Sequence, residues 1–98
     1  MWQLSYRPEV EDDILAGVTW YDDRLRGLGD VFLAEFLAAI QRIRENPLHF
    51  AIASNGLRPC LLKRFAYIVH FDINGQDILV IAVMAAGRDD SAFTHRGK

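Results

Sequence analysis

The chain has 98 residues, of which 51% are hydrophobic and 24% are charged, and its formal net charge at pH 7 is −2. This length predicts one small domain, residues 1–98, and excludes a second. The hydrophobic content excludes a disordered chain, and the sequence has no run of about 18 apolar residues that would span a bilayer. We therefore expect a soluble globular protein with no membrane partner.

The residues that bind metals and phosphates in other proteins are sparse here. Cys60 is the only cysteine, so it forms neither an internal disulfide nor a CxxC zinc site. His49, His70 and His95 are too far apart for an HxxxH pair, and no glycine-rich phosphate loop is present. We expect no metal and no cofactor. The N-terminus has no signal-peptide pattern, so we also expect a cytoplasmic protein.

Charge is distributed unevenly along the chain. Residues 1–57 carry nine acidic side chains and five arginines, a net charge of −4, whereas residues 58–98 carry four acids and six bases, a net charge of +2. This asymmetry predicts a basic surface on the second half that meets an acidic partner. A charge of +2 is too small for a protein that binds duplex DNA, so we expect no direct sequence-specific nucleic-acid binding.

The first half of the chain predicts one strand and two helices. Apolar and polar residues alternate over 2–7, which is typical of a half-buried strand. Apolar residues then recur at three- and four-residue steps over 8–25 and over about 31–46, which predicts two amphipathic helices. The segment Gly27-Leu28-Gly29 is expected to end the first helix, and Asp30 to cap the second. The two helices form a hairpin.

The second half predicts a loop and three strands. Residues 49–57 have no periodicity, and Asn74-Gly75 between two apolar runs predicts a tight β-hairpin. The strands are expected over 58–64, 66–72 and 77–85. The last of them is apolar at both parities, which favours a central strand covered on both faces. The polar tail, residues 87–98, is expected to be partly mobile.

These elements predict an α+β fold with the order β-α-α-β-β-β, in which an antiparallel sheet carries the N-terminal helical hairpin on one face. Several short motifs occur along this order: Trp20-Tyr21, Gly29, Phe32, Pro47, Leu57-Arg58, Lys63-Arg64-Phe65, Tyr67 and Arg88-Asp89. The ordered set resembles the RelE/ParE superfamily, the toxins of bacterial type II toxin–antitoxin pairs. The resemblance covers nearly the whole chain.

Two departures and the low basicity distinguish this chain within the superfamily. Phe65-Ala66-Tyr67 stands where relatives usually have Phe-Pro-Tyr, and Ala85 stands where they commonly have a histidine three residues before Arg88. The RelE branch, which cuts messenger RNA on the ribosome, is lysine-rich, whereas this chain has two lysines and a pI near 5.8. Ribosome binding depends on phosphate contacts, so the acidic pI favours the ParE branch.

The resemblance implies a toxin that inhibits DNA gyrase and replication by binding, as in plasmid stabilization systems, rather than by catalysis. It also implies a cognate antitoxin that wraps a helical or extended segment over the toxin. The expected assembly is either a homodimer of the toxin or a toxin–antitoxin hetero-oligomer. Acidic groups of the antitoxin segment are expected to meet Arg58, Lys63, Arg64 and Arg88. An ion pair of Arg88 with Asp89, Asp90 or an acid of the first helix is the competing interpretation.

Two other functions remain open. In a RelE-like ribosome-dependent mRNA endonuclease, Arg64 and Arg88 would stabilise the phosphate and His70 would transfer a proton. Regular strand alternation through Arg64 would, however, put Lys63 on the opposite face from Arg58 and Arg64. In a degenerate family member, the fold and the antitoxin would remain without toxicity, an alternative that the missing histidine at Ala85 keeps open.

Several conspicuous residues have structural interpretations that compete with functional ones. Tyr21 lies on the apolar stripe of the first helix and is expected in the core, and Cys60 is expected to be a buried, unreactive thiol. His70 is expected to be a partly exposed or hydrogen-bonded strand histidine. The acids of the first helical turn are expected to be solvated and to interact with the helix dipole: Glu9, Glu11, Asp12 and Asp13.

Overall fold

The computed structural model describes residues 1–97 and confirms the predicted order and the α+β class. The main elements are β1 (Gln3–Tyr6), α1 (Glu9–Arg24), α2 (Leu28–Glu45), β2 (Arg58–Leu61), β3 (Tyr67–Asn74) and β4 (Asp77–Ala85). Three short 3-10 turns complete them: η1 (Pro47–His49), η2 (Asp90–Ala92) and η3 (Thr94–Gly97). No helix within residues 1–97 is long and apolar enough to cross a membrane.

The four strands form one sheet in the order β1-β4-β3-β2. The predicted antiparallel pairing is confirmed for β2, β3 and β4, but it is wrong for β1, which pairs parallel to β4 with Gln3 opposite Asp77 and Tyr6 opposite Val80. The reason is the helical hairpin: two antiparallel helices return the chain to the end where β1 begins, so β2 runs in the direction of β1. Two chain reversals later, β4 has that direction again, and the sheet is mixed.

The tip of the helical hairpin differs from the prediction in its capping. Gly27 adopts a φ of 90°, and α2 begins at the next residue, so Asp30 lies inside the helix instead of capping it. The carboxylate of Asp22 in α1 replaces it, since its Oδ1 accepts hydrogen bonds from the amides of Gly27 and Gly29, each at 3.0 Å. Gly29 allows close packing, because a Cβ there would lie 2.6 Å from the carbonyl oxygen of Val18.

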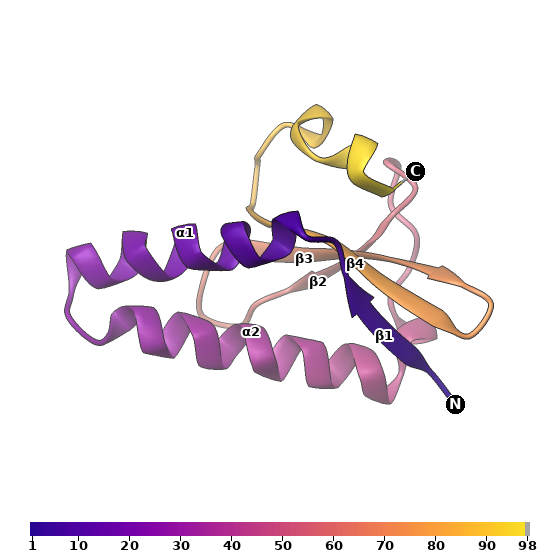
Figure 1. The fold of residues 1–98 in the computed structure, drawn as a ribbon, viewed down its shortest axis with the longest axis horizontal. Helices are drawn as coiled ribbons and strands as arrows, with labels where there is room; N and C mark the ends of the chain where they lie inside the picture. The colour runs from indigo at the N-terminus through magenta and orange to yellow at the C-terminus, as the bar shows by residue number, and fades with distance from the viewer. Residues whose placement is uncertain (98) are drawn as a thin grey trace.

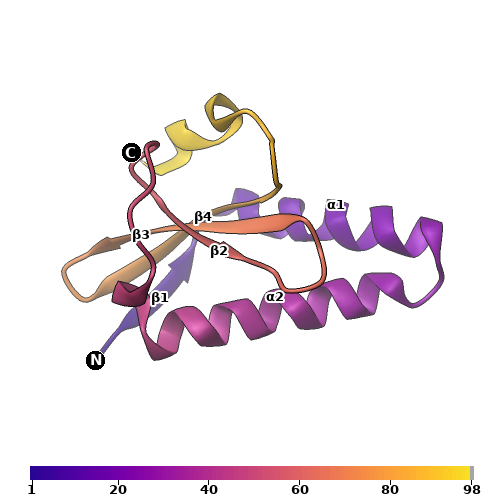
Figure 2. The ribbon, with the colours of Figure 1, turned by 180° about the vertical axis from the view of Figure 1, so that it is seen from behind.

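Strand β4 is buried on both faces, as its sequence predicts. Ile78, Val80 and Val83 belong to the core beneath the helices, whereas Ile81 and Met84 belong to a second cluster on the other face. The β3–β4 register skips Ile81, which marks a β-bulge that turns two successive residues toward the second face. Figures 1 and 2 show α2 on one side of the sheet and the C-terminal residues on the other.

Residues 88–96 cover this second face, and the partial mobility expected of the tail stays a prediction. Phe93 is 1% exposed, and the guanidinium of Arg96 forms an ion pair with Asp13 of α1 at 2.7 Å. Asp13 Oδ2 also accepts the Val83 amide at 3.0 Å, and Arg96 donates to the carbonyl of Ile81 at 3.4 Å. The pairing of β1 with β4 ends at Val80. Beyond that point, the side chains of Asp13 and Arg96 take the place of β1 along the edge of β4. The prediction of a solvated Asp13 is therefore wrong.

Two turns are displaced from their predicted positions. Strand β2 ends at Leu61 rather than near residue 64, because the Leu62 amide donates to the Tyr67 carbonyl at 3.0 Å and closes the connection to β3. The β3–β4 hairpin is confirmed, but its two-residue turn is Gly75-Gln76 rather than Asn74-Gly75. Within residues 1–97 only glycines have positive φ, so Asn74 stays in the strand and Gly75, at 63°, makes the turn.

The pairing of Asp13 and Arg96 leads to a stability prediction. Asp13→Ala leaves Arg96 and the Val83 amide without their acceptor in a nearly buried place, and it should lower the free energy of unfolding by about 3 kcal/mol. The neighbouring Asp12→Ala removes an exposed carboxylate and should change it by less than about 0.5 kcal/mol. Urea denaturation followed by circular dichroism measures both values, and equal effects of the two substitutions would contradict this assignment.

Candidate functional site

An aromatic cluster joins the helical hairpin to the turn between β2 and β3. Tyr21 of α1 lies 4.6 Å from Phe65 and 5.3 Å from Phe32, measured between ring centroids. Phe32 in turn lies 4.9 Å from Tyr67. These four rings are residues of the family-like motifs, and the structure places all of them in packing contacts, which confirms the core position predicted for Tyr21. The cluster therefore fixes where the β2–β3 turn lies.

Three of the four predicted partner-binding residues lie at the same end of the sheet, and we call Lys63, Arg64 and Arg88 the basic end. All three are exposed. The Ala86 amide donates to the Ala66 carbonyl at 2.7 Å, so the turn that carries Lys63 and Arg64 lies beside the segment that leads to Arg88. The predicted separation of Lys63 from Arg64 by strand alternation does not apply, because β2 ends before both.

Glu35 of α2 holds this turn in place. Its Oε1 accepts the Lys63 amide at 3.1 Å, and its Oε2 lies 3.7 Å from Nε of Arg64. The Arg64 side chain remains 71% exposed, so this ion pair leaves most of the guanidinium available.

Arg88 forms no ion pair with any residue of the described chain, and the alternative in which an acid neutralises it is wrong for residues 1–97. Burial and the neighbouring Tyr21 raise the pKa of Tyr67. The positive charge of Arg88 opposes this shift.

Arg58 lies apart from the basic end. It is opposite Phe71 at the start of β2, is half-buried, and donates from Nη1 to the carbonyl of Phe50. This hydrogen bond ties the loop after α2 to the sheet. The partner contact of Arg58 stays a prediction, but its visible role is structural.

His70 differs from both of its predicted roles. Its side chain is buried, with 7% exposure, and its ring lies 4.4 Å from that of Phe93. Nδ1 has no hydrogen-bond partner, so the expectation of a partly exposed or hydrogen-bonded histidine is wrong. Burial lowers the pKa of His70, and the charge of Asp90 opposes this shift. Tyr67, three residues earlier, faces the helical core, so His70 points to the opposite face of the sheet.

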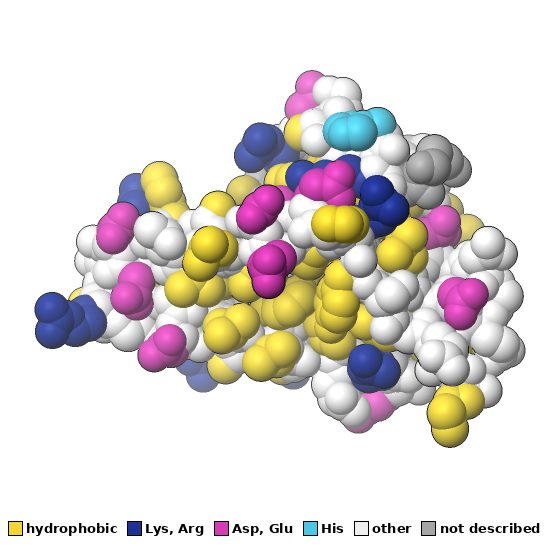
Figure 3. Space-filling view, in the orientation of Figure 1, with side chains coloured by type: hydrophobic (Ala, Val, Ile, Leu, Met, Phe, Trp, Pro, Cys, Tyr) yellow, Lys and Arg dark blue, Asp and Glu magenta, His cyan; other side chains and the backbone are white. Residues whose placement is uncertain are grey.

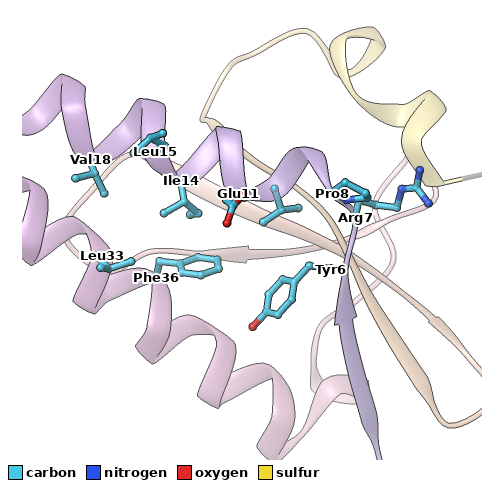
Figure 4. A pocket seen from close by; sticks show the side chains of 10 residues that line it. Tyr6, Arg7, Pro8, Glu11, Ile14, Leu15, Val18, Leu33 and Phe36 are labelled. Carbon is cyan, nitrogen blue, oxygen red and sulfur yellow. The ribbon is translucent and has the colours of Figure 1, made fainter.

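A groove between α1, α2 and the end of β1 is an exposed apolar feature that the sequence did not predict. Its volume is about 760 Å³, and Figure 4 shows Tyr6, Ile14, Leu33 and Phe36 pointing into it. Tyr6 is 44% exposed and Leu33 is 37% exposed. The space-filling view shows hydrophobic side chains gathered between the two helices (Figure 3). Leu33 lies outside the apolar stripe of the second helix. An apolar side chain in that position is the one signal in the sequence for this surface.

The remaining candidates for chemistry are enclosed. Cys60 is 1% exposed, and burial raises the pKa of its thiol, so the side chain is the buried thiol that the sequence predicts. Within residues 1–97, no group of three or more histidine, cysteine or acidic side chains is arranged to hold a metal ion. Among residues 1–97, the basic end and the groove are exposed surfaces available for binding another molecule.

The contacts of Glu35 predict a local effect on the basic end. Glu35→Ala removes the acceptor of the Lys63 amide, so that amide should exchange with solvent deuterium roughly fivefold faster, as expected for about 1 kcal/mol of lost hydrogen bonding. Glu45→Ala, at the exposed end of the same helix, is the matched control and should leave the Lys63 amide unchanged. Amide exchange measured by NMR distinguishes the two. No change in the Glu35 variant would mean that the aromatic cluster alone holds the turn.

Comparisons with known proteins bear on the fold. No family model and no curated protein sequence matches the chain. Among solved structures, a chain from the chromosomal ParDE toxin–antitoxin system of P. aeruginosa superposes with a TM-score of 0.78 and 14% identity, covering 88% of this chain and 97% of that chain. At this identity the likeness establishes the fold alone. The resemblance to the RelE/ParE superfamily is thus confirmed at that level: the chain has a ParE-like fold.

Proposed function

We propose that this protein is the toxin of a type II toxin–antitoxin pair, that it acts by binding rather than by catalysis, and that a cognate antitoxin neutralises it. The observation that carries the proposal is an exposed apolar groove on a ParE-like fold. Open apolar surface of this size on a small chain is typical of a site that a partner covers. The solved structure of similar fold belongs to a toxin–antitoxin system, which supports the same conclusion.

The antitoxin is expected to place a helical or extended apolar segment in the groove. Tyr6 lies in the groove at the end of β1, and no strand among residues 1–97 pairs with the outer edge of β1. The Gln3 amide donates to the carbonyl of Gln76, just before β4, and the Arg7 amide donates to the carbonyl of Val80 in β4. Strand backbone groups alternate in direction, so the amides of Leu4 and Tyr6 point outward. An extended segment can therefore continue the sheet at β1 and bury its apolar side chains beside Tyr6.

In this proposal the basic end contacts the target, which the family resemblance implies is DNA gyrase. Lys63, Arg64 and Arg88 give an exposed cluster of positive charge on an otherwise acidic chain. Such a cluster favours contact with acidic side chains of another protein and guides its association. In this proposal the protein blocks DNA replication in the bacterial cytoplasm.

The ribonuclease alternative lacks support at the residues that it requires. Arg64 and Arg88 are exposed at the basic end, but His70 lies beneath Phe93 on the second face of the sheet. A general base must reach the proton that it removes, and a buried side chain on the other face does not. The degenerate alternative differs from our proposal only in having no toxic activity.

Inhibition of purified gyrase tests the proposal. The protein should inhibit ATP-dependent DNA supercoiling, and Arg88→Glu should raise the concentration needed for half-inhibition about tenfold or more, as expected for an interface charge worth about 1.4 kcal/mol or more. Arg44→Glu makes the same charge change at an exposed position in the last turn of α2 and should have little effect.

Two results would contradict the proposal. Normal supercoiling at a large molar excess of folded protein would remove gyrase as the target. Cleavage of messenger RNA on purified ribosomes by the same preparation would establish the endonuclease in its place.

A further inference from the structure

Residues 88–96 form a strap over the second face of the sheet, and we call them the C-terminal strap. The strap follows Gly87, which has a φ of 86°, and it returns across β4 through the turns η2 and η3. Phe93 is its deepest residue, packed with Leu57, Ile81 and Met84. Without Phe93 this face would be an exposed apolar surface at the centre of the sheet.

Few contacts outside Phe93 hold the strap. Asp13 and Arg96 form its one ion pair within residues 1–97, and the side chains are 9% and 12% exposed. The hydrogen bonds of the strap backbone are local, such as Phe93 to Asp90 at 3.1 Å and Arg96 to Phe93 at 3.0 Å. Opening at Gly87 would therefore break the Phe93 packing, the ion pair and the hydrogen bond from Arg96 to the Ile81 carbonyl, and it would leave the helical core intact.

His70 lies directly beneath the strap. Its ring is 4.4 Å from that of Phe93 with an interplanar angle of 34°, and its buried Nδ1 has no hydrogen-bond partner. The strand neighbours Pro59 of β2 and Ala82 of β4 stand opposite it and carry no charge.

The charged groups around His70 come from the strap and from α1. Asp90 in η2 is the acid whose charge acts on His70, and its effect is smaller than that of burial. The charge of Arg96 is matched by Asp13, so that pair offers the imidazole no free carboxylate. A protonated ring in this position would carry a buried charge with an unpaired N–H group, which is costly.

We propose that the C-terminal strap is a pH-sensitive cover: protonation of His70 releases Phe93 and exposes the apolar face of β4, while the sheet and the helical hairpin remain folded. This inference goes beyond the proposed function and does not depend on it. The surface beneath the strap is then available only in acidic conditions.

The direction of the effect follows from linkage between protonation and opening. Burial lowers the pKa of His70 in the closed form, whereas the open form exposes an ordinary imidazole with a pKa of about 6.5. Above that pH both forms are neutral, and the opening equilibrium is constant. Below it the open form gains a proton first, so the opening constant rises by up to about tenfold per pH unit until the closed form also protonates.

The two methionines of the chain supply a direct test. Met84 is buried in the cluster with Phe93, whereas Met1 is fully exposed and serves as an internal reference. With ¹³C-methyl methionine, the full-length protein should give a Met84 signal that moves toward the position of Met1 between pH 7.5 and 5.0. Phe93→Ala should give the open position throughout this range.

The histidine variants decide the assignment. His70→Phe keeps an aromatic ring against Phe93 but has no proton to gain, so its Met84 signal should not move. His49→Gln and His95→Gln remove the exposed histidines and should behave as the unmodified chain does. An unchanged Met84 signal in the unmodified chain, or loss of the signal shift in His95→Gln, would overturn the proposal. So would a parallel loss of helical circular dichroism, because opening would then be global unfolding.

Discussion

Strand β4 is buried on both faces and hydrogen-bonded along both edges, and the rest of the fold is arranged around these contacts. Backbone amides and carbonyls in such a place need partners, because an unpaired buried group is costly. Strand β1 supplies partners only as far as Val80. Asp13 and Arg96 supply them beyond that point, so one short strand, one acid of α1 and one arginine near the C-terminus together complete the edge.

This arrangement places the two surfaces that can bind partners. Because β1 is short, α1 lies beside the rest of β4, and the end of β1 opens into the groove between the helices. The aromatic cluster of Tyr21, Phe32, Phe65 and Tyr67 fixes the opposite end of the sheet, where the basic end lies. Apolar and charged surfaces are thus separate.

Local patterns in the sequence were sufficient for the order of elements, the central strand and the β3–β4 hairpin, because periodicity and turn residues act over a few positions. Contacts between distant residues were not predictable in this way. Asp13 looked like one of several first-turn acids, and its partner Arg96 lies 83 positions away. Likewise, the pattern placed His70 in a strand, but only the fold shows that Phe93 covers it. The groove combines stripe residues of both helices, such as Ile14 and Phe36, with Leu33 and with Tyr6 of β1, and no local motif marks it.

The central claim is that a ParE-like fold with an open groove acts here as a toxin of DNA replication. Controlled expression of the chain alone in bacterial cells tests it most directly, with thymidine and methionine incorporation followed separately over the first minutes. The account predicts that thymidine incorporation falls first while methionine incorporation continues. An earlier fall in methionine incorporation would point to the ribosome and contradict the account, as would normal incorporation of both.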